Sequence, residues 1–353
     1  MYVSFEVKTQ TRRYPVCVGQ DLLGEVGHHI GGVADRVFVI TDDVISEIHL
    51  NPLLNGLNGS DIEAITKILP AGESIKTLET TGALYDFLTE NLASRSDTVI
   101  ALGGGVIGDI AGFVASTYKR GTRLIQVPTT LLAQVDSALG GKTAVNLPDG
   151  KNLVGSFYQP HAVVADVCTL TTLSTNEFTA GLSEVIKYGV IMDSELLDIL
   201  VNSKDEILNR VPGTLALIVE RCLRNKARVV EEDEREEGRK REILNFGHTI
   251  GHAIEICSDH TVRHGQAVAM GMVEEARLAE RMGLLDSESS ELLVSMLSMF
   301  GLPTEIPSSI DVKELDEIMQ QDKKVRHGQL ILPVLVELGR TEIKVVESVY
   351  NLS

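Results

Sequence analysis

The chain is poor in the residues that mark several large classes of protein. Its cysteines, Cys17, Cys168, Cys222 and Cys257, lie far apart and form no C-x-x-C pair. This spacing argues against a disulfide framework and against a zinc site built from thiolates. No apolar run approaches the roughly 20 residues that cross a bilayer, and the first residues lack the apolar core of a signal peptide. We therefore expect a cytoplasmic protein with reduced thiols.

Positive charge is also scarce. The chain has 32 Lys and Arg against 50 Asp and Glu, so its formal net charge is −18. Nucleic acids and anionic membranes bind clustered positive charge, and neither is an expected partner. An anionic small molecule would need a local basic pocket. The length of 353 residues favours two domains over one.

The pattern of the sequence changes near residue 175. Before this point, β-branched runs alternate with helical stretches and glycine-rich turns, at 37–40, 62–69, 98–102, 123–127 and 162–167. This alternation predicts a parallel α/β domain over residues 1–175. After it, helical periodicity prevails, at 196–208, 215–230 and 267–282. Residues 176–353 therefore read as an all-helical domain.

Two polar segments are exceptions to this regular pattern. Residues 129–159 are rich in glycine and too irregular for one element, and loops of this size inside a domain are usually functional. The charged run at 231–242 is typical of a solvated helix end or loop. Arg241, at the edge of this run, is a candidate for binding an anion.

A glycine-rich turn in the first half suggests a nucleotide site. The segment GGGVIGD, residues 103–109, follows an apolar run and fits the G-x-G-x-x-G spacing. In that motif, backbone N–H groups and a helix N-terminus approach a pyrophosphate. The usual fingerprint lies on the first βα turn with its ribose carboxylate downstream, whereas here the candidate, Asp42, is upstream. We infer a Rossmann-like domain of non-standard form; a tight turn without a ligand is the alternative.

The second half contains the donor atoms of a catalytic metal site. Glu184 in EVIKYG, His248 in NFGHTIGHAIE and His264 in VRHGQAVAMGM would make a three-ligand set with an open position. His252 follows His248 by four residues, so both would share one helix face. The alternatives are buried, hydrogen-bonded histidines and a surface ion pair between Glu184 and Lys187. These three histidines lie within 17 residues of a chain that has only nine, which favours a site.

Six segments resemble, in order and at matching separations, the signature blocks of the 3-dehydroquinate synthase family. They are GGGVIGDIAGFVAS, PTTLLAQVDSALGGKTAVN, GKNLVGSFYQP, EVIKYG, LNFGHTIGHAIE and HGQAVAMGM. The resemblance covers nearly the whole chain. It implies a Rossmann-like NAD-binding domain and a helical metal- and substrate-binding domain, with the active site in the cleft between them. It also implies a homodimer.

The resemblance further implies a reaction and the residues that perform it. 3-Deoxy-D-arabino-heptulosonate 7-phosphate would be converted to 3-dehydroquinate and phosphate, with transient oxidation at C5 by NAD, and zinc or cobalt would be held by Glu184, His248 and His264. The implied substrate contacts are Arg120 from a partner subunit, Asp136, Lys142, Lys151, Asn152, Lys187, Lys226, Arg241, Asn245 and His252. The implied NAD contacts are Asp42, Glu73, Lys76, Gly104, Gly105, Val106, Ile107, Gly108, Asp109, Thr129, Thr130, Lys142, Lys151, Thr169, Thr172 and Leu173. Of Lys323 and Lys324, the sequence does not decide which, if either, faces the substrate.

Three other functions are compatible with these motifs. One is a related sugar-phosphate cyclase with the same cofactors, although Lys226, Arg241, Asn245 and His252 favour the dehydroquinate branch. Another is a metal-dependent alcohol dehydrogenase of the glycerol dehydrogenase type, which would consume NAD stoichiometrically. The third is a binding protein without catalysis, which would have no need of an open metal position.

Overall fold

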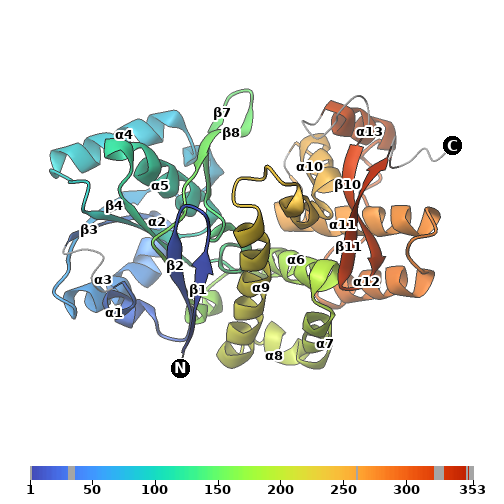
Figure 1. Cartoon of the computed structure of the whole chain (residues 1–353), viewed down its shortest axis with the longest axis horizontal. Helices are drawn as coiled ribbons and strands as arrows, with labels where there is room; N and C mark the ends of the chain where they lie inside the picture. The colour runs from blue at the N-terminus through green and yellow to red at the C-terminus, as the bar shows by residue number, and fades with distance from the viewer. Residues whose placement is uncertain (1, 31–35, 260, 322–329, 347–348, 350–353) are drawn as a thin grey trace. The chain divides into compact units, whose positions relative to one another are not determined.

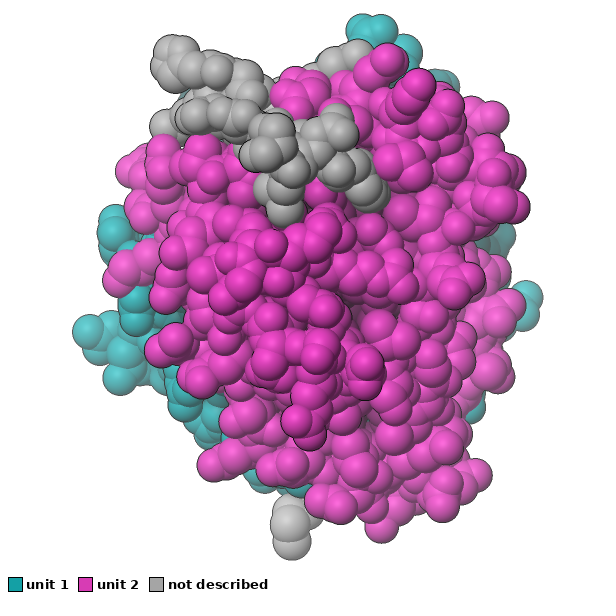
Figure 2. Space-filling model, turned by 90° about the vertical axis from the view of Figure 1, so that its right-hand side faces the viewer, with its two compact units in different colours: residues 1–173, 212–234 teal, residues 174–211, 235–353 magenta. Residues whose placement is uncertain are grey.

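The computed structural model describes residues 2–30, 36–259, 261–321, 330–346 and 349. The chain forms two compact units, coloured separately in Figure 2. Unit 1 comprises residues 1–173 and 212–234, and unit 2 comprises residues 174–211 and 235–353. The break after Leu173 lies near the boundary expected from the sequence. The sequence analysis placed residues 212–234 in the second domain, but they belong to unit 1.

The returning segment is helix α9, Pro212–Glu232. It packs against the turns η5 (Ala133–Ser137) and η6 (Val167–Thr171) of unit 1, with Leu215, Ile218 and Cys222 buried. Its periodicity correctly predicts a helix with one apolar face. Periodicity alone does not reveal which core that face covers, so the sequence assigned α9 to the wrong half.

Unit 1 is built around a seven-stranded sheet in the order β1-β2-β9-β6-β5-β3-β4. Figure 1 labels β1, β2, β3 and β4 of this sheet. Only β1 runs antiparallel to its neighbour, and the other pairs are parallel. The strands are β1 Tyr2–Lys8, β2 Arg13–Gly19, β3 Arg36–Asp42, β4 Glu63–Leu69, β5 Thr98–Gly103, β6 Arg123–Pro128 and β9 Ala162–Asp166. The sequence prediction of a parallel α/β domain is confirmed.

Helices cover both faces of this sheet. On β3, Val37 and Val39 lie in one apolar cluster, and Phe38 and Ile40 lie in the other, as the alternation of side chains in a strand requires. The first cluster includes residues from α1 (Val26–His29) and α3 (Asn51–Asn58), and the second includes residues from α4 (Leu78–Glu90) and α5 (Gly105–Thr117). The remaining short turns of unit 1 are η1 Leu23–Glu25, α2 Asp43–Ile45, η2 Ser46–Leu50, η3 Glu73–Ile75 and η4 Tyr118–Arg120.

The polar segment 129–159 is more regular than its composition suggests. After the turn η5, it forms a hairpin of β7, Lys142–Leu147, and β8, Gly150–Phe157. Several residues of β8 are exposed. The hairpin forms a two-stranded sheet of its own, separate from the main sheet.

Unit 2 is helical apart from one hairpin. Its elements are α6 Thr175–Met192, α7 Ser194–Asn202, α8 Lys204–Leu208, η7 Lys240–Asn245, α10 His248–Cys257, α11 His264–Arg281, α12 Ser287–Met299, α13 Val312–Gln321, β10 Leu330–Glu337 and β11 Arg340–Val346. The hairpin β10–β11 departs from the all-helical expectation. Lys323 and Lys324 lie outside the described residues. Among the described residues, no helix is both long and apolar enough to span a membrane.

Glycines allow α10 and α11 to approach each other closely. A Cβ on Gly271 would lie 2.0 Å from the backbone oxygen of Gly247, so only glycine fits at this crossing. Gly247 itself has a φ of 77°, in the left-handed region that favours glycine. Its N–H donates to the fully buried carboxylate of Glu275 on α11 at 2.8 Å. This contact fixes the start of α10, where His248 lies.

Candidate active site

Three residues from three helices of unit 2 converge on one point. Glu184 lies in the middle of α6, and His248 and His264 are the first residues of α10 and α11. The Nε2 atoms of His248 and His264 lie 3.4 and 3.7 Å from Oε1 of Glu184. The three donor atoms all lie within 4.8 Å of one another. The sequence prediction therefore names residues that the fold brings together.

The two imidazoles present the same nitrogen to this point. Nδ1 of His248 donates to the backbone oxygen of Phe246 at 3.1 Å, and Nδ1 of His264 donates to Oε2 of Glu255 at 3.2 Å. Because each Nδ1 carries its proton toward an oxygen, the neutral form of each ring has its Nε2 lone pair directed toward Glu184. Metal-binding histidines usually have this arrangement.

The separations suit a tetrahedral zinc or cobalt ion. Ligand bonds of about 2.0–2.1 Å at tetrahedral angles place donor atoms about 3.3 Å apart. The observed 3.4 and 3.7 Å are close to this value and longer than an ordinary N–H···O hydrogen bond. The side chain of Glu184 is 2% exposed; its Oε2 forms an ion pair with Lys187, and its Oε1, which faces both Nε2 atoms, has no hydrogen-bond partner. A buried carboxylate with this surrounding fits a cation.

The charges of these groups depend strongly on one another. Burial opposes ionisation of Glu184, but the neighbouring ammonium of Lys187 and His248 hold its pKa well below the usual range. Burial and Lys187 lower the pKa of His248. Burial would also lower the pKa of His264, yet the carboxylates of Glu184 and Glu255 raise it to about 9. Lys187 itself is buried and forms an ion pair with Glu184, so this pair is an internal contact and not the surface pair considered above.

Glu255 is a residue that the sequence analysis missed. Together with His252 and His264 it forms a second group of potential metal ligands. It lies seven residues after His248 and three after His252, so helical spacing alone places it on the same face of α10. His252 is exposed, and its ring centroid lies 5.7 Å from that of His248 and 5.9 Å from that of His264. It is near the metal group but outside the first trio.

The glycine-rich turn of unit 1 has an open helix N-terminus. Strand β5 is buried along its whole length and leads directly into α5, which begins at Gly105. The N-cap residue, Gly104, offers no side chain to the first N–H groups of the helix. A Cβ on Gly104 would lie 3.0 Å from the Thr130 side chain. These free N–H groups and the small residues fit a pyrophosphate.

Two of the predicted NAD contacts pair with each other in unit 1. The Nζ atom of Lys76 contacts Oδ2 of Asp109 and also Oδ1 of Asn152, a predicted substrate contact. Burial raises the pKa of Asp109, and the ammonium of Lys76 opposes this shift. Lys76 is only 4% exposed, so the pair is largely internal.

Other predicted NAD contacts also have structural partners. Asp42 caps α2 by accepting from the Ile45 N–H at 2.9 Å, and Glu73 accepts from Asn146 at 2.7 Å. The Thr169 hydroxyl is buried between Gln134 and the Asp166 backbone oxygen. Thr172 contacts His49 at 2.9 Å. Val106, Ile107 and Gly108 belong to the first turns of α5, Thr129 and Thr130 follow β6, and Leu173 follows η6.

The predicted substrate contacts divide between the two units. In unit 1, Lys226 on α9 forms an ion pair of 3.0 Å with Asp136 on η5, and Lys142 and Lys151 lie exposed on the hairpin β7–β8. In unit 2, Arg241 is buried on η7, 3.5 Å from Glu236, and Asn245 ends the same turn half-buried. Arg120 is exposed at the end of η4 in unit 1.

Comparison with known proteins identifies the family of this chain. Residues 66–180 match the model for the N-terminal part of 3-dehydroquinate synthase, and residues 181–325 match the model for its C-terminal part. The 3-dehydroquinate synthase of Halorhodospira halophila is 47% identical over 94% of this chain and 93% of its own length. The chain belongs to the 3-dehydroquinate synthase family. It is therefore an enzyme, and the resemblance of the six segments is confirmed.

Solved structures show the same fold as this 3-dehydroquinate synthase family member. A 2-deoxy-scyllo-inosose synthase complexed with carbaglucose-6-phosphate, NAD+ and Co2+ has a TM-score of 0.87 and 28% identity, covering 98% of this chain and 95% of that one. A 2-epi-5-epi-valiolone synthase from Streptomyces hygroscopicus with NAD+ and Zn2+ bound has a TM-score of 0.86 and 27% identity, covering 94% and 92%. The predicted fold class is thus confirmed over the length of the chain.

Proposed function

We propose that this chain converts 3-deoxy-D-arabino-heptulosonate 7-phosphate to 3-dehydroquinate and phosphate, using NAD and a zinc or cobalt ion. The observation that carries the proposal is the convergence of both Nε2 atoms on the buried carboxylate of Glu184. A catalytic metal needs such a set of three ligands with one position open. Relatives with this enzyme name, 47% identical, support the choice of substrate.

The cofactors would supply chemistry that side chains lack. When bound, NAD would take up and return a hydride at C5 of the substrate, and the metal ion would act as a Lewis acid at the C5 oxygen. The residues of the chain would first bind the two cofactors. Glu184, His248 and His264 would hold the metal, and the open N-terminus of α5 would hold the pyrophosphate of NAD.

Acid–base work would fall to His252. Its side chain is exposed, and its ring centroid lies 5.7 Å from that of His248. An imidazole with a pKa near neutrality transfers protons in both directions at physiological pH. We assign it proton transfer at the C5 oxygen. The substrate's own phosphate would take the C6 proton when the phosphate leaves.

The remaining predicted residues would bind and orient the substrate. The cationic side chains would balance its carboxylate and phosphate, and arginine would do so with a two-pronged contact. These residues are Arg120 from a partner subunit, Lys142, Lys151, Lys187, Lys226 and Arg241. Asp136, Asn152 and Asn245 would bind neutral hydroxyl groups. A homodimer and a cytoplasmic location belong to the same proposal.

The test is phosphate release from 3-deoxy-D-arabino-heptulosonate 7-phosphate, with absorbance at 340 nm followed in parallel. Protein treated with EDTA should be inactive, and added zinc should restore phosphate release without accumulation of NADH. Steady NADH production with a simple alcohol would instead identify a dehydrogenase. Phosphate release from glucose 6-phosphate, but not from the heptulosonate, would identify a related cyclase.

A further inference from the structure

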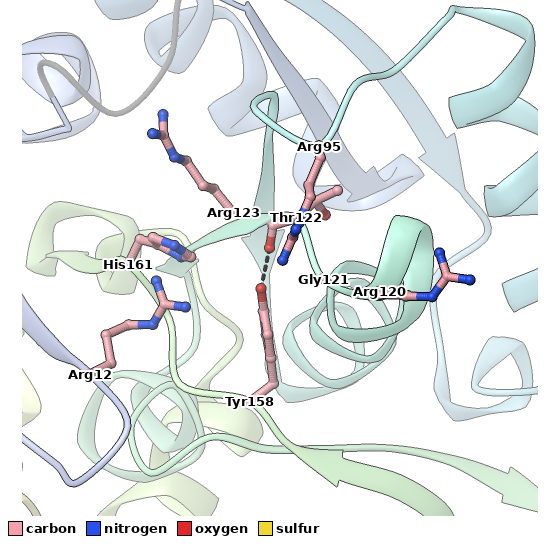
Figure 3. Close-up of a pocket in the computed structure, with 8 residues that line it drawn as sticks. All are labelled: Arg12, Arg95, Arg120, Gly121, Thr122, Arg123, Tyr158 and His161. Atoms are coloured by element: carbon pink, nitrogen blue, oxygen red, sulfur yellow. Dashed lines mark hydrogen bonds between the residues drawn. The ribbon is translucent and has the colours of Figure 1, made fainter.

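A basic pocket lies in unit 1, away from the glycine-rich turn. Its volume is about 260 Å3, and no carboxylate lines it. The charged and aromatic residues that line it are Arg12, Arg95, Arg120, Arg123, Tyr158 and His161, shown in Figure 3. Four arginines around one pocket are unexpected in a chain with a net charge of −18.

The topology of the sheet explains why these residues meet. Arg12 precedes β2, His161 precedes β9, Arg123 begins β6, and Arg95 lies in the loop before β5. These four strands are parallel neighbours in the order β2-β9-β6-β5. The pocket is therefore at the amino ends of adjacent strands. The glycine-rich turn follows the carboxyl end of β5, so the two sites lie at opposite ends of the parallel strands of this sheet.

Within the described part of the chain, none of the four guanidiniums forms an ion pair with a carboxylate, although the chain has 50 acidic residues. Arg12 lies over the Tyr158 ring, with its Cζ atom 5.8 Å from the centroid. Burial together with the charges of Arg12 and Arg123 lowers the pKa of His161 to about 4.

Of the neutral side chains of the pocket, His161 has an N–H donor that is not used by its contact with Leu124, and Tyr158 is held in place. The Leu124 N–H donates to Nδ1 of His161 at 3.2 Å, so the hydrogen of this neutral imidazole is on Nε2. The Tyr158 hydroxyl donates to the Thr122 backbone oxygen, which holds the ring beneath Arg12. In Figure 3, Arg12 and Arg95 extend toward this group from different sides, whereas the side chains of Arg120 and Arg123 point away from it.

We propose that Arg12, Arg95 and His161 form a binding site for a phosphate-class anion, either inorganic phosphate or the phosphoryl group of a small metabolite. Guanidinium groups match the oxygens of phosphate in pairs, and a volume of 260 Å3 accommodates a small phosphorylated molecule. The bound anion would supply the negative charge that the surrounding residues lack. Arg120 lines the pocket and is also a proposed substrate contact, but it points away from the anion site, whose three residues have no part in the proposed reaction.

The test is binding of inorganic phosphate and of glycerol 3-phosphate to the full chain, at constant ionic strength maintained with sodium chloride. Phosphorus NMR and thermal unfolding would report saturable binding. Arg12→Gln and Arg95→Gln should each weaken it at least about tenfold, since each removes a charged hydrogen-bond donor. Arg95 is exposed, so its replacement should leave the fold intact. The tighter of the two ligands would distinguish free phosphate from a phosphoryl group.

Two control variants separate this pocket from other sites. Arg13→Gln removes the same charge from an exposed neighbour that does not line the pocket, and it should leave binding unchanged. Lys151→Ala alters the proposed substrate site, and phosphate should still bind to it. The proposal fails if phosphate binds no better than chloride, if only Lys151→Ala abolishes binding, or if the arginine variants change the oligomeric state but not phosphate affinity.

Discussion

Nδ1 of His264 lies 3.2 Å from Oε2 of Glu255, and Nε2 of the same ring faces Glu184 at 3.7 Å. One imidazole thus connects a carboxylate on α10 with the carboxylate at the centre of the metal group. A carboxylate behind a metal-binding histidine fixes the ring and makes it a better donor. Glu255 is therefore a positioning residue for the proposed metal.

Replacement of this carboxylate should weaken metal binding. We expect Glu255→Gln to reduce zinc affinity by about 10- to 100-fold while the protein stays folded. Competition with a chelator would measure the affinity, and the visible spectrum of the cobalt-loaded protein would report the altered geometry. Glu274→Gln is a matched control, because the Glu274 side chain is also 12% exposed but pairs with Arg277 on the surface. Equal zinc affinities in both variants would refute the role of Glu255.

Substitutions of His264 and His252 should have different effects, because we assign His264 to metal binding and His252 to proton transfer. His264→Ala removes one of three proposed ligands, so the purified variant should contain no zinc and release no phosphate. His252→Asn should retain zinc but lose about 10²- to 10⁴-fold in kcat/KM, because it removes an acid–base group and no ligand. Elemental analysis and the phosphate-release assay would separate the two effects. Normal zinc content in His264→Ala would contradict the ligand assignment.

The sequence predicts some parts of this structure better than others. Glu184, His248 and His264 could be selected because two histidines and one glutamate are a known set of metal ligands. The turn at 103–109 could be selected because the spacing of its glycines matches a nucleotide-binding motif. The contact between Lys76 and Asn152 could not be predicted from such patterns. Asn152 lies 76 residues away, and only the position of the hairpin β7–β8 brings it to Lys76.

Element types were likewise easier to predict than their positions. The helix at 212–232 follows from its apolar stripe, but its return to unit 1 depends on which surface was left uncovered. The hairpin β10–β11 was missed although β10 is almost entirely buried. A short apolar run such as LILPVLVE has no periodicity that separates a buried strand from a buried helix.

Loss of the ion pair between Lys76 and Asp109 should lower the free energy of unfolding by an amount that depends on pH. Because burial raises the pKa of Asp109, the folded protein binds its proton at a higher pH than the unfolded chain does. Loss of the ammonium in Lys76→Met would raise this pKa further. We expect a loss of roughly 2 kcal/mol in the free energy of unfolding at pH 8, since the carboxylate remains partly exposed. The deficit should shrink as the pH falls toward 5, because protonation removes the buried charge.

Urea unfolding at several pH values would measure this effect. Lys8→Met is a suitable control, because Lys8 pairs with Glu6 at an exposed site and its loss should cost little at any pH. Asp109→Asn in the Lys76→Met background should remove the pH dependence. A deficit that grows as the pH falls would show that Asp109 is not its source.

Asp42 combines a structural contact with a proposed role in binding NAD, and one substitution separates them. Its carboxylate caps α2 through the Ile45 N–H, and asparagine caps a helix about as well as aspartate. Asp42→Asn should therefore leave the free energy of unfolding almost unchanged. The amide lacks the negative charge that would accept the ribose hydroxyl hydrogens, so NAD affinity should fall about tenfold. Asp43→Asn, at the exposed neighbouring position, should change neither quantity by much. Titration of NAD into each variant would decide the matter, because full affinity in Asp42→Asn would leave this residue with only its structural contact.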